Sequence, residues 1–173
     1  MRYSSSGCRH LLDSRNASWM RTSGRAIMFD ASRRRILVER YRGQRQGYSA
    51  FPGGMIEPGE TLEECLSREL VEEVGARIVD LEFLFLAENF FSYEGESIHG
   101  IELFCEVRLE SDKVQSQLAG HEFPWMEVAT LGEVDLRPTE VRDRIIDGTY
   151  RHLRHLVIGR TAAPEGSSDP DDT

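Results

Sequence analysis

The sequence predicts a single α/β domain, and three observations lead to that fold class. Short β-rich runs alternate with two helical patterns along the chain. The length of 173 residues suits one domain with a proper core. The composition, with 39% hydrophobic and 29% charged residues, is ordinary for a soluble globular protein, and no internal repeat is visible.

Two of the predicted strands are long, and the others are short. The long β-rich runs, 81–91 and 98–109, flank a Gly- and Glu-containing turn at 92–97, which predicts a hairpin. The shorter runs are bounded by turn residues and cover residues 25–29, 35–41, 49–51 and 122–128. The first two of these are joined by a polar turn, and they supply the core candidates Ile27, Phe29, Ile36 and Val38.

The two helical patterns cover residues 61–74 and 139–147. Thr61, followed three residues later by Glu64, matches a capping box at the start of the first helix. Apolar side chains recur at helical spacing until Gly75 supplies a left-handed stop, and they are Leu62, Leu66, Leu70 and Val74. The second helix is amphipathic and is entered through Pro138.

Three carboxylates share one edge of the first helix. On a wheel of about 100° per residue, Glu69, Glu72 and Glu73 fall within an arc of roughly 100° beside the apolar stripe. Close like charges near a helix C-terminus are unfavourable unless a cation lies among them. Carboxylate oxygens are the ligands that Mg²⁺ or Mn²⁺ prefers. Arg68 lies one turn before Glu72, so we expect it to pair with that side chain and hold it in place.

A glycine-rich loop precedes this helix, because turn residues bend the chain on both sides of residues 55–57: Pro52, Gly53, Gly54, Pro58 and Gly59. Together the loop and the helix resemble the Nudix box, Gly-x5-Glu-x7-Arg-Glu-aliphatic-x-Glu-Glu-x-Gly-aliphatic. Its fixed positions are filled by Gly54, Glu60, Arg68, Glu69, Leu70, Glu72, Glu73, Gly75 and Ala76. The resemblance implies an α/β/α sandwich, with a mixed β-sheet between helices, over residues 20–158.

The same resemblance implies a Mg²⁺-dependent pyrophosphohydrolase, with Mn²⁺ able to substitute. Its substrate would be a nucleoside diphosphate linked to a further group X, as in a nucleotide sugar, an ADP-ribose-like compound, a nucleoside triphosphate or a dinucleoside polyphosphate. Glu69, Glu72 and Glu73 would hold the metal with the help of Arg68. The general base is left open between Glu69 and Glu122, which lies in a polar loop before the last predicted strand. The alternative is a catalytically silent Nudix module that binds a nucleotide as a sensor.

Further residues are candidates for shaping the substrate pocket. Arg40, with Gly53 and Gly54, is a candidate for phosphate contact. Arg40, Arg42 and Arg45 could each bind phosphates or lie in a solvated surface turn. Three aromatic side chains could stack on a base or pack in the core: Phe90, Phe91 and Tyr93. His99 could contact a phosphate or have a purely structural role.

For the other acidic residues of this segment, a role at the metal is weighed against a structural or solvent-exposed role. Glu60 is as well explained by bracing the loop as by binding the metal. The other three are expected to be solvated: Glu57, Glu63 and Glu64.

Charge and composition limit the partners. A net charge of −9 disfavours a broad nucleic-acid interface and favours a small phosphorylated molecule that arrives with its metal. No stretch is long and apolar enough for a membrane span, and the three cysteines fit a reducing cytoplasm. We expect a flexible extension over residues 1–19 and a disordered acidic tail over 159–173. The sequence leaves a homodimer open.

Overall fold

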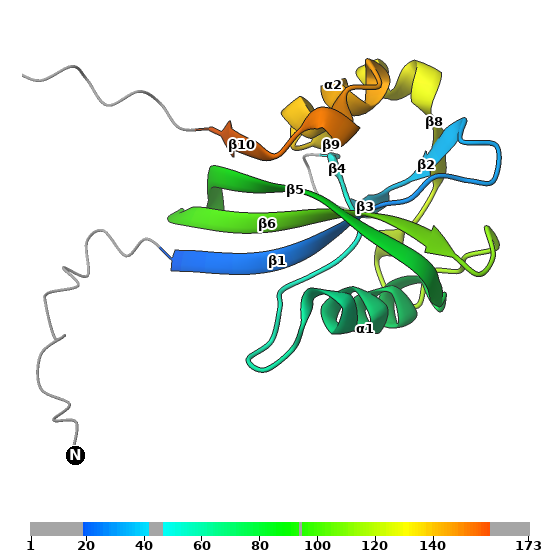
Figure 1. Ribbon diagram of the computed structural model, residues 1–173, viewed down its shortest axis with the longest axis horizontal. Coiled ribbons are helices and arrows are strands. Elements are labelled where there is room, and N and C mark those ends of the chain that lie inside the picture. Colours follow the sequence, from blue (N-terminus) through cyan, green and yellow to red (C-terminus); the bar gives the residue numbers. More distant parts are fainter. Residues whose placement is uncertain (1–18, 42–46, 94, 160–173) are drawn as a thin grey trace, which may run out of the picture.

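The computed structural model describes residues 19–41, 47–93 and 95–159. Its centre is a mixed four-stranded sheet in the order β1-β6-β5-β10 (Figure 1). The strands are β1 (Trp19–Ile27), β5 (Ile78–Tyr93), β6 (Glu96–Leu109) and β10 (His155–Ile158). β5 and β6 form the predicted hairpin, while β1 joins β6 and β10 joins β5 in parallel. The expected extension and tail fall almost entirely outside the described residues.

Two small sheets extend this core. β2 (Arg35–Leu37) pairs with β8 (Trp125–Glu127), and the other sheet has the order β7-β3-β4-β9. Its strands are β3 (Glu39–Tyr41), β4 (Ser49–Ala50), β7 (His121–Glu122) and β9 (Leu136–Arg137). The predicted strands 35–41 and 122–128 are therefore each divided between two sheets. Pro124 interrupts the predicted strand 122–128 because proline has no N–H to donate to a neighbouring strand. Its carbonyl accepts the N–H of Val38, which lies between β2 and β3.

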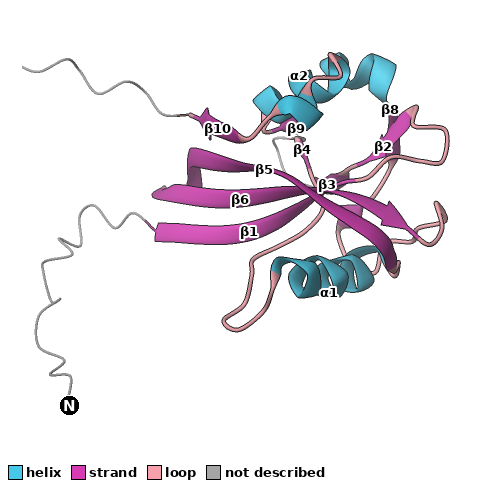
Figure 2. Ribbon diagram, viewed as in Figure 1, coloured by secondary structure: helices cyan, strands magenta, loops and turns pink. Residues whose placement is uncertain are grey.

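Helices cover both faces of the central sheet, which confirms the predicted sandwich. α1 (Leu62–Val74) lies on one face, and α2 (Thr139–Ile146) lies on the other with the 3₁₀ segments η1 (Val128–Glu133) and η2 (Tyr150–His152) (Figure 2). Within the described residues, no helix has the length and apolar character needed to cross a membrane.

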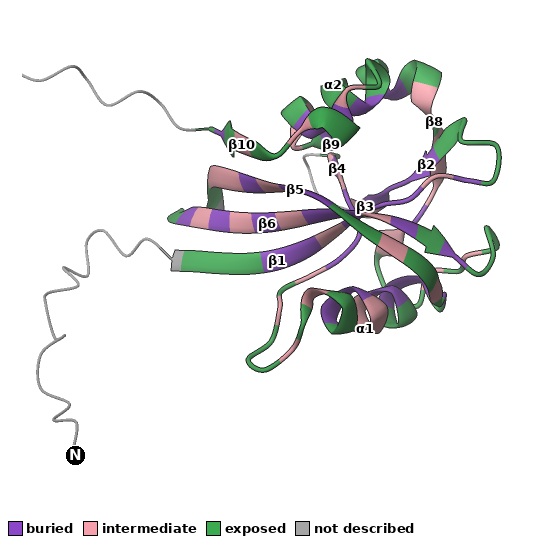
Figure 3. Ribbon diagram, viewed as in Figure 1, coloured by how far each residue is buried: buried purple, intermediate pink, exposed green. Residues whose placement is uncertain are grey.

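Each face of the sheet has its own hydrophobic core. The alternation of buried side chains along β6 sends Phe104 to the α2 side, whereas Cys105 and Val107 pack under α1. The buried residues of α1 form a stripe that faces the sheet (Figure 3). Of the predicted core residues, Ile27, Ile36 and Val38 are fully buried, and Phe29 is partly buried against them.

Candidate active site

The α1 helix begins and ends where its local sequence predicts. The hydroxyl of Thr61 accepts the N–H of Glu64 at 3.2 Å, and the Glu64 carboxylate accepts the N–H of Thr61 at 2.8 Å, which completes the capping box. Gly75 ends the helix at φ 65° and donates to the carbonyl of Val71. The box acids are thus held on a helix that is fixed at both ends.

The loop before the helix folds back against the edge of α1. The Glu73 carboxylate is buried and accepts the backbone N–H of Gly53 at 3.2 Å. A Cβ at Gly54 would collide with the Glu69 carboxylate, so the absence of a side chain there leaves room for that acid. Glu72 is exposed. The structure therefore gathers Gly53, Gly54, Glu69 and Glu73, and leaves Glu72 at the rim.

Backbone contacts with β1 explain why glycine is needed at position 53 of this loop. Gly24 donates to the carbonyl of Gly54 at 3.0 Å, and Ala26 donates to that of Pro52 at 2.9 Å. Gly53 has a φ of 124°, and a Cβ there would also collide with the carbonyl oxygen of Gly24. Close approach of the loop to β1 therefore fixes the position of the Gly53 N–H that Glu73 accepts.

Arg68 links the loop to the helix, but Glu72 is the most distant of its three acidic partners. Its guanidinium donates to both Glu60 oxygens at 2.9 and 3.0 Å and to Glu69 at 2.8 Å, whereas the expected contact with Glu72 measures 3.6 Å. The Glu57 N–H also donates to Glu60, and the Arg68 hydrogen bonds lower the pKa of Glu60 to about 2. Of the two roles considered for Glu60, these contacts correspond to bracing of the loop.

Burial dominates the electrostatics of Glu73. Its side chain is removed from water, and this, followed by the charges of Glu39 and Glu69, raises its pKa to about 8. Glu39 was not foreseen as part of this region. It is only 3% exposed on β3, and its carboxylate lies 2.6 Å from Nδ1 of His121. The burial of Glu39 could have been predicted from strand alternation. Glu39 follows Leu37 by two residues, so both side chains lie on the same buried face.

The donor chemistry of this helix edge fits a hard divalent cation. Glu69, Glu72 and Glu73 supply carboxylate oxygens, the ligand type that Mg²⁺ and Mn²⁺ take. Among the described residues, however, no three Asp, Glu, His or Cys side chains already form a closed coordination group. Glu69 pairs with Arg68, and Glu72 is exposed with one oxygen 3.6 Å from the same guanidinium.

The other predicted base, Glu122, lies on β7 opposite Arg40 of β3. Directly paired residues of an antiparallel ladder share a face, so Glu122 and Arg40 lie on one face, and Glu39 and His121 lie on the other. Arg40 is half-buried, and its guanidinium lies 3.8 Å from the sulfur of Met126.

Most of the remaining candidates for substrate contact lie on the β5–β6 hairpin. His99 stacks on Phe90 with ring centroids 4.2 Å apart and lies 3.1 Å from a Glu88 oxygen, which corresponds to a structural role. Phe91 is partly exposed. The side chains of Arg42, Arg45 and Tyr93 fall outside the part of the chain that the structure describes.

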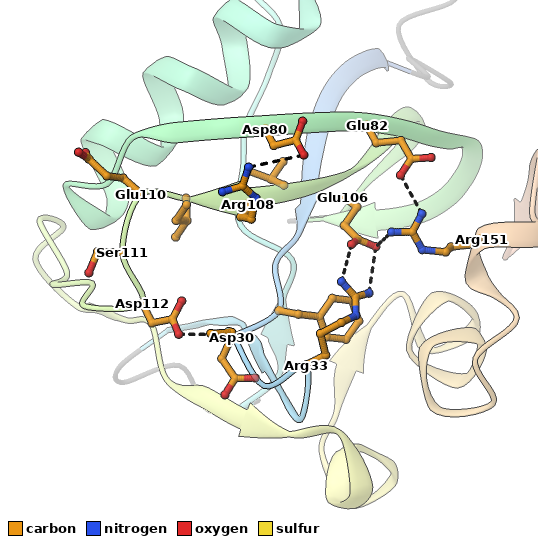
Figure 4. Close-up of a pocket in the computed structure, with 14 residues that line it drawn as sticks. Asp30, Arg33, Asp80, Glu82, Glu106, Arg108, Glu110, Ser111, Asp112 and Arg151 are labelled. Carbon is orange, nitrogen blue, oxygen red and sulfur yellow. Dashed lines mark hydrogen bonds and ion pairs between the residues drawn. The ribbon is translucent and has the colours of Figure 1, made fainter.

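A polar hollow of about 640 Å³ lies away from these acids, between the start of β5, the end of β6 and the β1–β2 turn (Figure 4). Several of its charged side chains are paired across the hollow. Arg33 donates to both oxygens of Glu106, and Arg151 contacts Glu106 at 2.6 Å and Glu82 at 2.7 Å. The hydroxyl of Tyr150 also donates to Glu106. This network ties η2 to the sheet, and the hollow is not lined by Glu69, Glu72 or Glu73.

The fold and this helix edge together define a small mixed α/β domain that carries a carboxylate-rich helix under a glycine loop. The family model of the NUDIX domain matches residues 20–147. The chain therefore belongs to the Nudix family.

Relatives share parts of this domain. The chain is 37% identical over 82 residues to the ADP compounds hydrolase NudE of Escherichia coli K12, an alignment that covers 45% of this chain and 44% of NudE. It is 55% identical over 38 residues to the NAD-capped RNA hydrolase NudC of Chromobacterium violaceum, covering 22% of this chain and 14% of NudC. The chain thus spans less than half the length of these relatives. A NUDIX hydrolase from Nitrosomonas europaea has a similar fold, with a TM-score of 0.59 at 15% identity over 79% of this chain and 93% of that one.

Proposed function

We propose that this protein is a Mg²⁺-dependent pyrophosphohydrolase that cleaves the P–O–P bond of a nucleoside diphosphate linked to a further group X. The observation that carries the proposal is the placement of buried Glu73 and neighbouring Glu69 against Gly53 and Gly54 on one edge of α1. A complete set of box acids on a helix with fixed ends is the arrangement that metal-assisted hydrolysis needs.

The residues divide the work as follows. A divalent ion, when bound, neutralises the phosphate oxygens and acidifies the attacking water. Glu69, Glu72 and Glu73 would hold that ion, and Arg68 orients Glu69 through its 2.8 Å contact. Either Glu69 or Glu122 takes the proton from water. Arg40 contacts the substrate phosphates, and the backbone of Gly53 and Gly54 lets them approach closely.

The proposal covers several chemical classes for the group X. NudE is named as a hydrolase of ADP compounds and NudC as a hydrolase of NAD-capped RNA. We propose a small nucleotide as the substrate, because the net charge of −9 opposes binding of a long polyanion. A capped RNA therefore belongs in the substrate panel as a competitor. A cytoplasmic location is part of the same proposal.

Hydrolysis in ¹⁸O-labelled water tests the reaction. Nucleotide sugars, ADP-ribose, nucleoside triphosphates, dinucleoside polyphosphates and capped RNA are incubated with Mg²⁺, with Mn²⁺ and with excess EDTA. We expect turnover with either metal and none with EDTA, and label in one phosphate-bearing product, because metal-bound phosphate oxygens lower the barrier at phosphorus. Label on a carbon centre, or full turnover in EDTA, would contradict the proposal. Binding without turnover would identify the silent sensor module.

A matched pair of variants tests the site itself. Glu73→Gln keeps the shape and helix propensity of the side chain and removes its charge, so kcat should fall by roughly 10²-fold or more while the fold persists. Glu63→Gln makes the same change at an exposed position of the same helix and should leave kcat within about twofold. Equal losses in both variants would show that the acids of α1 have been assigned to the wrong face.

A further inference from the structure

Gly53 is held by hydrogen bonds on both sides of its α-carbon. Its N–H donates to the Glu73 carboxylate at 3.2 Å, and its carbonyl accepts Nη1 of Arg25 at 3.0 Å. Gly53 is buried, and its φ of 124° lies in a region that residues with side chains rarely adopt. Glycine has the greatest backbone freedom of all residues, so the two hydrogen bonds together select one conformation from many.

Arg25 makes a contact with the glycine loop that the backbone of β1 does not make. The N–H groups of β1 hold the carbonyls on either side of Gly53, which are those of Pro52 and Gly54. Among the described residues, only the Arg25 side chain donates to the carbonyl of Gly53 itself. The same nitrogen lies 3.5 Å from the carbonyl oxygen of Phe51. One side chain therefore opposes rotation of the peptide that follows Gly53.

Glu102 balances the charge of Arg25. In the parallel ladder Glu102 is opposite Ser23, two residues before Arg25, so the two charged side chains lie on one face of the sheet. One oxygen of Glu102 lies 3.7 Å from Nε of Arg25, and the other accepts the amide of Asn89 at 3.4 Å. Glu102 is only 6% exposed, and a carboxylate so far removed from water needs a cation beside it. The guanidinium thus contacts Glu102 through Nε and the loop through Nη1, a division that a single ammonium group cannot make.

We propose that Arg25, which lies outside the Nudix box, is a positioning residue for the divalent-cation site on α1, because it fixes the Gly53 backbone whose N–H holds Glu73. This rests on the proposed function, in which Glu73 binds the metal. Without Arg25, the peptide after Gly53 can rotate and its N–H loses its alignment with Glu73. The carboxylate then has freedom that metal binding must remove. The alternative is an ion pair of Arg25 with Glu102 that only joins β1 to β6.

A double variant tests this without leaving a buried charge unpaired. Arg25→Met with Glu102→Gln removes the donor to Gly53 together with the carboxylate that Arg25 balances, and replacing both members of such a pair is often neutral for stability. In metal-free protein, we expect the Gly53 amide hydrogen to exchange roughly tenfold faster by NMR, which corresponds to the loss of one hydrogen bond from a charged donor. We expect the affinity for Mn²⁺ alone, measured by electron paramagnetic resonance without substrate, to fall roughly 10- to 100-fold, the range for partners that orient metal ligands.

Three further variants separate the positioning role from the ion pair. Glu102→Gln alone breaks the pair but keeps the contacts of Arg25 with the loop, so both measurements should stay within about threefold of wild type. Arg21→Met removes an exposed arginine of the same strand and should change neither. Arg25→Lys keeps a charge beside Glu102 but has a single donor group, so it should show both changes to a smaller degree, and it serves if the double variant does not fold.

The outcomes are distinct. A wild-type affinity for Mn²⁺ in folded protein that lacks Arg25 overturns the inference, whatever the exchange of Gly53. Equal losses in Glu102→Gln and in the double variant also overturn it, because the ion pair would then account for the effect. Wild-type protein that binds no Mn²⁺ would instead overturn the proposed function, and the exchange of Gly53 would still show whether Arg25 fixes the loop.

Discussion

At the residue scale, the outstanding feature is a carboxyl group that its surroundings keep from ionising. Burial, then Glu39 and Glu69, raise the pKa of Glu73 from 4.5 to about 8. A metal-free protein at neutral pH therefore holds a proton on Glu73. Because a ligand carboxylate must be ionised, binding of a divalent ion should release that proton.

The same shift predicts how the stability of the metal-free protein depends on pH. Between pH 4.5 and about pH 8 the folded state keeps a proton on Glu73 that the unfolded chain has lost. Folded protein then binds more protons than unfolded protein, so the free energy of unfolding contributed by this group falls as pH rises through that window. Thermal unfolding of EDTA-treated protein from about pH 5 to pH 9 measures the slope.

Glu73→Gln is the control for this slope, since glutamine does not titrate. In the variant, the part of the decrease in unfolding free energy that Glu73 causes should be absent. Near pH 8 the variant should therefore be more stable than the wild type. Identical pH profiles for the variant and the wild type would mean that Glu73 ionises normally in the folded protein.

At the element scale, Arg68 decides how the glycine loop is attached to α1. Its planar guanidinium holds both oxygens of Glu60 and also reaches Glu69 and the carbonyl of Met55. Lysine carries the same charge but cannot make this set of directed contacts at once. The loop and the acidic edge of the helix are thus coupled through one side chain.

Arg68→Lys should consequently loosen residues 55–60 without unfolding the domain. We expect amide hydrogen exchange in that segment to accelerate by roughly tenfold, which corresponds to the loss of about one charge-assisted hydrogen bond. Arg77→Lys, an exposed substitution just after α1, is the matched control and should leave the exchange pattern unchanged. Unaltered exchange in Arg68→Lys would show that the loop is held by its backbone bonds to β1 instead.

At the scale of the whole molecule, the two ends of the described chain are joined by the sheet and by the ion pairs of the polar hollow. β10 adds to the edge of β5, and the preceding η2 is tied to β6 through Glu106, which Arg33 and Arg151 both contact. These contacts stabilise the fold at a distance from the α1 acids. Stability and activity should therefore respond separately to a change at Glu106.

Glu106→Gln tests that separation. Removing the charge weakens the pairs with Arg33 and Arg151, so the free energy of unfolding should fall by about 1.5–3 kcal/mol, the scale of hydrogen bonds to charged groups. Metal affinity and kcat, measured well below the melting temperature, should stay at wild-type values. A large loss of kcat in a folded variant would instead make the hollow part of the functional site.

Those parts of the protein that depend only on neighbouring residues could be predicted before the structure was known. The limits of α1, its capping box, its Gly75 stop and the β5–β6 hairpin follow from local backbone chemistry, and the box acids are recognisable from spacing alone. The other features depend on contacts between residues that are distant in the sequence. Strand pairing divided residues 35–41 between two sheets and added β10 in parallel, and the folding of the loop onto α1 turned Arg68 toward Glu60. The contact of buried Glu39 with His121 has the same origin, because the two residues lie 82 positions apart and no local pattern records a contact across that separation.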